Sequence, residues 1–155
     1  MRELQLQPRL KLLADLVPQG ARLTDVGTDH GYLPVYLLQR GKIQQAIASD
    51  VGREPLEHAR RTATEYGIRG IDFRLCDGLS GVAKEETDTI VIAGMGGDTI
   101  VSILSATPWT KRNTLLLLQP MTKTEMLRQW LADNGYAFQL ERLVWDKGNL
   151  YPILL

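Results

Sequence analysis

Apolar positions along the 155-residue chain follow two alternating patterns, one typical of amphipathic helices and the other of buried strands. A first group, at positions 6, 10, 13, 16 and 17, recurs at helical spacing, and Pro8 stands where a first helical turn tolerates proline. The pattern then predicts strands at 21–26, 45–50, 71–75, 89–93 and 114–118, and helices at 32–38, 55–66, 98–105 and 123–134. Strands that alternate with helices predict an α/β fold, a parallel sheet with helices on both faces.

The last two apolar runs, 136–145 and 150–155, are joined by only four residues, 146–149. A connection this short excludes a helical crossover, so we expect an antiparallel hairpin after the parallel strands. No internal repeat, low-complexity tract or linker-like segment interrupts the pattern. Residues 1–155 are therefore expected to form a single domain.

Composition limits the partners and the cellular compartment that we expect for the protein. The 18 basic and 18 acidic side chains cancel, so net charge gives no sign of a nucleic-acid or membrane partner. The single cysteine, Cys76, has no internal disulfide partner, and no export signal precedes the first helix. No apolar run approaches the roughly 20 residues of a membrane-spanning helix. We expect a soluble, cytoplasmic protein without a membrane or metal partner, and the sequence leaves its oligomeric state open.

A glycine-punctuated corner follows the first predicted strand and reads Asp-Val-Gly-Thr-Asp-His-Gly at 25–31. A strand, a tight turn and a helix start form a ligand-binding corner in parallel sheets. The spacing differs from the dinucleotide pattern G-x-G-x-x-G, because Asp25 opens the motif and Asp29 stands where a middle glycine is expected. Such an acidic corner suits a cationic ligand better than a pyrophosphate, although glycines that only make a tight turn are the alternative.

Three further groups follow predicted strand ends. Asp50 suits the two hydroxyls of a ribose, or else caps the helix that begins near Arg53. Asp77, after Cys76 and before Gly78, suits the exocyclic amine of a purine, or else forms an ordinary turn. The run 93–97, Ala-Gly-Met-Gly-Gly, allows a planar ligand to approach closely, or else is only a tight strand-to-helix turn.

Together these aspartates fit a nucleoside-bearing ligand with a cationic part, and S-adenosylmethionine has a base amine, a ribose and a sulfonium. Other conspicuous residues have simpler interpretations. His58 is expected to be solvated and Cys76 to be a small buried filler. The three tryptophans, at positions 109, 130 and 145, are expected in the core or at an interface.

With these residues in view, the chain resembles class I S-adenosylmethionine-dependent methyltransferases, and more closely the bacterial tRNA adenine-N1 methyltransferase family called TrmK. The resemblance covers nearly the whole chain, and its motifs lie at 25–34, 48–51, 76–79, 92–97 and 118–120. It implies a Rossmann-like, seven-stranded sheet with an antiparallel final strand, and methylation of adenosine N1 at position 22 of the tRNA D-arm. Family members usually carry a further C-terminal helical region that helps hold tRNA, so the resemblance leads us to expect that residues 1–155 are the catalytic domain without that region. They also often have asparagine where this chain has Met121.

The resemblance and the chemistry together suggest roles for individual residues. Methylation of a ring nitrogen uses its lone pair and needs no strong base. A carboxylate that stabilises the new cation is more useful, so Asp29 is the first catalytic candidate. His30 and Tyr32 are expected to shape the same wall of the pocket as Asp29. Gly97, Gln119 and Pro120 are expected to border the substrate base. The expected cofactor-binding residues are Asp25, Gly27, Thr28, Asp29, His30, Gly31, Asp50, Val51, Cys76, Asp77, Gly78, Ala93, Gly94, Met95 and Gly96.

Two other functions remain open at this point. One is a methyltransferase that acts on a different nucleic-acid amine or on a small molecule, because cofactor residues are easier to identify than substrate residues. The other is a module that binds the cofactor or RNA without turnover.

Overall fold

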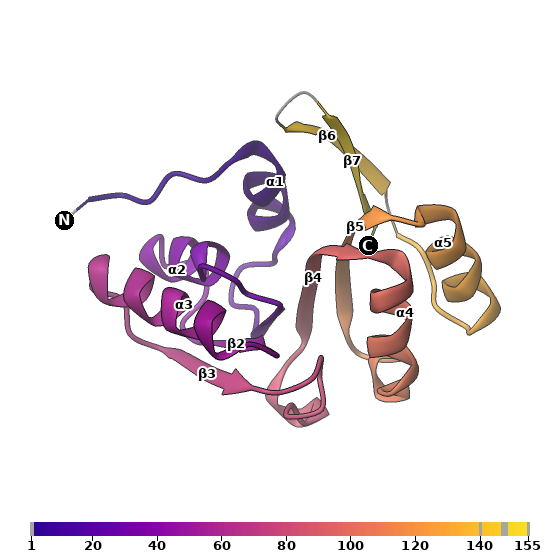
Figure 1. The fold of residues 1–155 in the computed structure, drawn as a ribbon, viewed down its shortest axis with the longest axis horizontal. Coiled ribbons are helices and arrows are strands. Elements are labelled where there is room, and N and C mark those ends of the chain that lie inside the picture. The colour runs from indigo at the N-terminus through magenta and orange to yellow at the C-terminus, as the bar shows by residue number, and fades with distance from the viewer. Residues whose placement is uncertain (1, 140, 147–148, 155) are drawn as a thin grey trace.

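The computed structural model describes residues 2–139, 141–146 and 149–154. Seven strands form one sheet in the order β3-β2-β1-β4-β5-β7-β6 (Figure 1). Neighbours among the first five strands of that order pair in parallel, and β7 pairs antiparallel with both β5 and β6. The strands are β1 (Leu23–Val26), β2 (Ala46–Asp50), β3 (Ile71–Leu75), β4 (Thr89–Gly96), β5 (Leu115–Thr122), β6 (Glu141–Asp146) and β7 (Asn149–Leu154).

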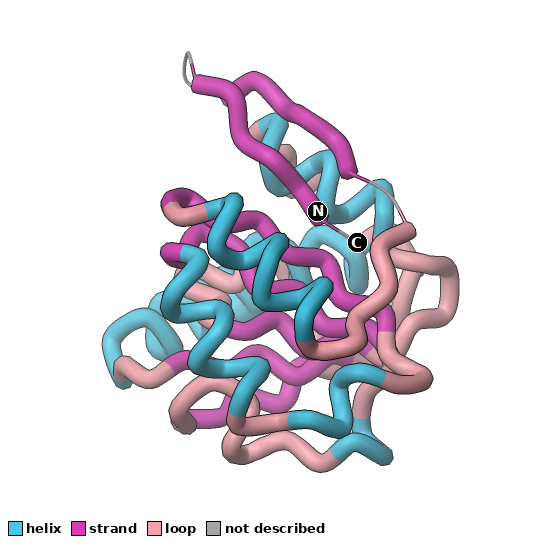
Figure 2. The backbone as a smooth tube through the Cα atoms, turned by 90° about the vertical axis from the view of Figure 1, so that its right-hand side faces the viewer, coloured by secondary structure: helices cyan, strands magenta, loops and turns pink. Residues whose placement is uncertain are grey.

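Helices cover both faces of this sheet, as the alternating pattern predicts. They are α1 (Pro8–Leu16), α2 (Tyr32–Gln39), α3 (Arg53–Glu65), α4 (Gly97–Ser105) and α5 (Thr124–Asp133), with short 3₁₀ turns η1 (Lys84–Glu86) and η2 (Pro108–Lys111). In Figure 1, α1, α2 and α3 lie on one side of the strands and α4 and α5 on the other. Figure 2, viewed from the α4 and α5 side, shows these helices in front of the strands, with the β6–β7 hairpin projecting beyond them.

Each face of the sheet has its own apolar core, because side chains alternate between the faces along a strand. On β4, Val91 packs with Leu13 of α1 and Leu37 of α2 on one face. Its neighbours Ile90 and Ile92 point to the opposite face and pack with residues of α4 and α5. All three β4 side chains are completely buried. Burial on both faces explains why the central strands are continuous apolar runs.

Strands β4 and β5 extend further than their apolar patterns predict. The pattern ends them at 93 and 118, but β4 runs to Gly96 and β5 to Thr122. Their pairing continues past a bulge between Ala93 and Met95, where Gly94 has a φ of +77°. Glycine adopts this conformation without strain, so the bulge re-aims the strand end without ending the ladder.

The C-terminal hairpin is confirmed, with a different start. β6 begins at Glu141 rather than at 136, and its register with β7 runs from Glu141↔Leu154 to Asp146↔Asn149. The segment 136–139 is irregular, and the Tyr136 hydroxyl lies 2.7 Å from the Thr110 hydroxyl instead. Lys147 and Gly148, at the centre of the predicted turn, lie outside the described residues.

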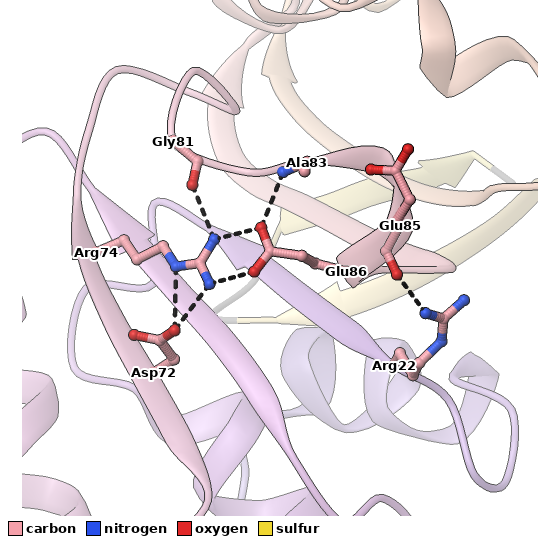
Figure 3. Close-up of polar contacts among 7 residues, drawn as sticks. All are labelled: Arg22, Asp72, Arg74, Gly81, Ala83, Glu85 and Glu86. Carbon is pink, nitrogen blue, oxygen red and sulfur yellow. Dashed lines mark hydrogen bonds and ion pairs between the residues drawn. The ribbon is translucent and has the colours of Figure 1, made fainter.

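The long connection between β3 and β4 is held by a cluster of charged residues that the sequence pattern does not predict (Figure 3). Arg74 of β3 donates to Asp72, to both carboxylate oxygens of Glu86 and to the Gly81 carbonyl, at 2.6 to 3.2 Å. Glu86 also accepts from the Ala83 amide at 3.0 Å. These contacts fix the connection that begins with Cys76, Asp77 and Gly78.

Candidate functional site

A pocket of about 410 Å³ opens at the carboxyl ends of β1, β2 and β4, within the usual size range of small-ligand sites. This is the edge where parallel α/β sheets bind ligands. Predicted site residues that line it are Asp25, Gly27, Thr28, Asp29, His30, Tyr32, Asp50, Ala93, Gly94 and Met95. Residues that the sequence analysis does not assign to the site also line it, namely Arg9, Leu10, Leu33, Val91 and Met121.

The corner after β1 turns tightly against β2. The amides of Gly27 and Thr28 both donate to the Ser49 carbonyl, at 2.8 and 3.0 Å. Gly27 has a φ of +69°, and a methyl group on it would lie 2.3 Å from Met95 Cε. The turn therefore requires glycine at this position, and the flexible end of the Met95 side chain packs against it.

Asp25 lies at the base of the pocket and is the most buried of its three carboxylates. Only 6% of the residue is exposed, and Oδ2 accepts a hydrogen bond from the Thr28 hydroxyl at 2.9 Å. Burial raises the pKa of Asp25 to about 7, and the negative charges of Asp50 and Asp29 act in the same direction, against the Thr28 hydrogen bond. A cationic ligand in this pocket would favour the ionised form of Asp25.

Asp29 and Asp50 meet at the mouth of the pocket. Asp29 adopts a φ of +56°, a conformation in which aspartate is enriched among non-glycine residues. Its amide donates to Asp50 Oδ2 at 3.4 Å, while its own side chain is 68% exposed. Asp50 Oδ1 accepts from the Gly52 amide at 3.0 Å, which fixes the carboxylate at the end of β2.

Three stacked rings lie at one side of the site, and two of them, His30 and Tyr32, line the pocket. His30 stacks on Tyr32 with ring centroids 5.2 Å apart, and on His58 of α3 at 5.1 Å with the ring planes 1° apart. His58, which is expected to be solvated, has a side chain that is 34% exposed and also stacks on His30. Gly31 allows this approach of α3, since a methyl group there would lie 2.9 Å from Ala59 Cβ.

Gln119 and Pro120 are buried beneath the pocket rather than exposed in it. Gln119 Oε1 accepts from Arg9 Nη1 at 2.7 Å and from the Gly94 amide at 3.3 Å. Gln119 thereby joins α1 to β4 and β5. Gly97 packs against the β5–α5 connection, where a methyl group would lie 2.4 Å from the Lys123 carbonyl oxygen.

The remaining predicted residues lie next to the pocket without lining it. Val51 is 75% exposed just beyond Asp50, and the Cys76 amide donates to the Asp50 carbonyl at 3.0 Å. Cys76 is half-buried rather than fully buried, and Asp77 is exposed. The cofactor roles of Gly31, Val51, Cys76, Asp77, Gly78 and Gly96 stay predictions, as do those of the residues that line the pocket.

Arg9 is the most consequential residue that the sequence analysis missed. Its place on an amphipathic helix far from the glycine corner identifies it only as one of several surface cations. The signal lies in the fold, because α1 packs beside α2 and β6, and Arg9 thereby reaches the pocket and Gln119 of β5.

Comparison with known proteins identifies the family. A model described as "Methyltransferase domain" matches residues 6–154. The tRNA (adenine(22)-N(1))-methyltransferase of Bacillus subtilis (strain 168) is 37% identical over 157 residues, covering 100% of this chain and 66% of the relative. The crystal structure of Bacillus subtilis TrmK superposes with a TM-score of 0.92 at 37% identity, over 98% of this chain and 66% of that one.

The chain belongs to the TrmK methyltransferase family. Another structure similar to this TrmK family member is Streptococcus pneumoniae Sp1610, solved in complex with S-adenosyl-L-methionine. Its TM-score is 0.88 at 40% identity, over 94% of this chain and 70% of that one. The chain thus spans about two thirds of the length of these relatives.

The described part of this TrmK family member contains neither a membrane-spanning helix nor a candidate metal site. No helix there is long and apolar enough to cross a membrane. Within the same residues, no group of three or more His, Cys, Asp or Glu side chains is arranged to hold a metal ion.

Proposed function

We propose that residues 1–155 form the catalytic domain of a cytoplasmic S-adenosylmethionine-dependent methyltransferase that methylates N1 of adenosine 22 in the D-arm of tRNA. The observation that carries this proposal is the convergence of Asp25, Asp29 and Asp50 on one pocket at the carboxyl edge of a methyltransferase sheet. The reaction and its position are those of the Bacillus subtilis relative, a tRNA (adenine(22)-N(1))-methyltransferase.

The residues of the pocket fit this cofactor in their chemistry. Asp50 at the end of β2 is the acceptor for the ribose hydroxyls. Asp25 and Asp29 supply negative charge for the cationic end. The bulge at Gly94 exposes backbone to a ligand without an intervening side chain. When bound, S-adenosylmethionine supplies an electrophilic methyl group.

The protein's own contribution to methyl transfer is alignment and electrostatics. Adenine N1 attacks with a ring lone pair, so no side chain has to remove a proton for the bond to form. Positive charge appears on the purine, and the Asp29 carboxylate at the pocket mouth stabilises it. His30 and Tyr32 form a flat wall beside Asp29 against which the base is held.

The substrate has to present an unpaired base. Adenine N1 is occupied in a Watson–Crick pair, so the nucleotide is flipped out of its stack before it enters the pocket. The chain carries no net charge. Its affinity for tRNA therefore depends on local groups and not on a general positive field.

The test is incorporation of tritiated methyl groups into two tRNA transcripts that differ only at position 22, adenosine in one and guanosine in the other. Wild-type protein is expected to label only the first. Asp29→Asn should lower kcat by about 100-fold, as loss of a charge-stabilising group typically does. Asparagine also tolerates the positive φ at position 29, so the fold is retained.

Asp15→Asn is the matched control, because Asp15 lies on α1 outside the pocket and pairs with Lys11. It should leave kcat unchanged. Equal labelling of both transcripts would refute the assigned position, and no labelling of either would refute the proposed activity. An unchanged kcat in Asp29→Asn would remove Asp29 from the mechanism.

A further inference from the structure

We propose that a basic groove at the opposite end of the sheet from the methyl-transfer pocket binds the phosphate backbone of the tRNA. This inference rests on the proposed function and adds a docking surface for the substrate. Among the described residues that line the methyl-transfer pocket, three are aspartates, Asp25, Asp29 and Asp50, and one is an arginine, Arg9. Such a lining repels phosphates, so the tRNA backbone needs cations elsewhere on the protein.

The groove has a volume of about 440 Å³ and lies between η1, η2 and the start of β5. Among the described residues, its lining contains four cationic side chains and one carboxylate, those of Arg22, Lys84, Lys111, Arg112 and Glu85. The balance of charge is the reverse of that in the methyl-transfer pocket. A surface of this kind attracts a polyanion.

The charge of Arg22 is already balanced within the protein. Its Nε donates to Asp88 Oδ2 at 3.4 Å, and its Nη1 donates to the Glu85 carbonyl at 2.6 Å (Figure 3). The net positive charge of the groove therefore comes from the other three cations, against the single carboxylate of Glu85.

Those three cations are accessible to a ligand. The side chains of Lys84, Lys111 and Arg112 belong to exposed residues. Within the described part of the chain, Lys84 and Arg112 make no side-chain hydrogen bond or ion pair. The Lys111 ammonium lies 5.9 Å from the centre of the Tyr136 ring, a contact that leaves N–H donors for an anion.

The turn that carries Lys111 and Arg112 is anchored to the core. Thr107 Oγ1 donates to the Ile103 carbonyl in the last turn of α4 at 3.0 Å, and Thr110 Oγ1 donates to the Thr107 carbonyl at 2.8 Å. Both threonines are buried. Because the backbone is fixed, only the long side chains have to be ordered when a phosphate binds, which limits the entropic cost.

The groove and the methyl-transfer pocket lie at opposite ends of the same two strands. At the groove end Thr89 of β4 is paired with Leu115 of β5, and at the pocket end Gly96 is paired with Thr122. Strand residues are about 3.3 Å apart, so these ends are separated by roughly 23 Å. A duplex covers this distance in about seven base pairs, since phosphates on one strand lie about 3.4 Å apart along its axis. One stem of a tRNA therefore reaches the groove while a base next to it occupies the pocket.

Two other interpretations of the groove make different predictions. If its cations are only solvated, their removal leaves the affinity for tRNA unchanged. If they act only through the overall charge of the protein, the removal of any two exposed cations weakens tRNA binding equally.

The test is fluorescence anisotropy of a labelled tRNA transcript with the wild-type protein and with the double variant Lys111→Gln/Arg112→Gln, at several salt concentrations. The variant should raise Kd for tRNA about tenfold, at the low end for contacts with charged groups. The slope of log K against log salt should become shallower by about 1.4 to 1.8, the value of two phosphate contacts. Affinity for S-adenosylmethionine, measured by calorimetry, should stay unchanged.

Arg61→Gln/Arg69→Gln is the matched control, because it removes two positive charges at exposed positions that line neither the groove nor the methyl-transfer pocket. It should change Kd for tRNA by less than about twofold. Lys111→Arg/Arg112→Lys keeps both charges and should retain the wild-type Kd and salt slope.

Unchanged Kd and slope in Lys111→Gln/Arg112→Gln, or equal losses in it and in the control, would overturn the assignment of the groove. A wild-type protein that does not bind the transcript would overturn it as well. Methyl transfer is measured separately on the same transcript. A wild-type protein that binds tRNA but transfers no methyl group would refute the proposed function, and the comparison of affinities would still decide the role of the groove.

Discussion

The buried carboxyl of Asp25 should make the stability of the ligand-free protein depend on pH in a direction that one substitution removes. Asp25→Asn keeps the size of the side chain and an oxygen to accept the Thr28 hydroxyl, but it cannot ionise. The comparison therefore isolates the cost of the buried negative charge.

The sign follows from the raised pKa. Asp25 has a pKa of about 7 in the folded protein against an ordinary value of 3.8, so the folded state holds a proton that the unfolded state has lost. The folding free energy that this proton contributes is fully present below about pH 4 and is lost as pH rises through 7. A shift of this size corresponds to on the order of 4 kcal/mol, at 1.36 kcal/mol per pKa unit.

Urea denaturation followed by circular dichroism at pH 4 to 8.5 measures this effect. The free energy of unfolding of Asp25→Asn minus that of the wild type should increase by a few kcal/mol between pH 4 and 8. Other titrating groups cancel in the subtraction. A difference that stays constant over this range would refute the buried-carboxyl interpretation.

Four further substitutions test other parts of the account. Asp50→Asn should weaken S-adenosylmethionine about tenfold in calorimetry, because an amide accepts ribose hydroxyls less strongly than a carboxylate does. Gly31 and Gly41 have nearly the same φ, +71° and +70°, but only Gly31 has a close neighbour. Gly41→Ala should lower the free energy of unfolding by about 1–2 kcal/mol because of the positive φ alone. Gly31→Ala should lower it by about 1–3 kcal/mol more, because the added methyl group also clashes with α3. Arg74 lowers the pKa of Glu86 to about 2, so Glu86→Gln should have a lower free energy of unfolding than the wild type at pH 7. This difference should shrink as pH falls below 4.5, because the wild type then loses the stabilising charge as well.

Each of these has a clear contrary result. Equal cofactor affinity in Asp50→Asn would reject its ribose role. Equal costs at the two glycines, measured by thermal denaturation, would show that contact with α3 does not constrain the corner. A pH-independent deficit in Glu86→Gln would mean that the ion pair with Arg74 does not shift the carboxylate's titration.

Several residues of the site could be predicted from the sequence with a single topological rule. Carboxyl ends of parallel strands share one edge, so residues that end separate apolar runs, such as Asp25, Asp50 and Gly94, were predictable neighbours. Local pattern also predicted the antiparallel hairpin, because four residues do not allow a crossover.

What the sequence did not reveal depends on packing between distant segments. Arg9 reaches the pocket only because α1 packs at its edge, and His58 meets His30 only because Gly31 lets α3 approach. Gln119 looked like a group that borders the substrate, yet it points inward and joins β5 to α1 and β4. Single-residue patterns do not encode such orientations.

The most direct test of the account is to incubate this chain with unmodified tRNA and S-adenosylmethionine and to map the methylated nucleoside by mass spectrometry. The account predicts 1-methyladenosine in the fragment that contains position 22 and in no other fragment. A methyl group on a different nucleoside, or an unmodified position 22 after prolonged incubation, would contradict it.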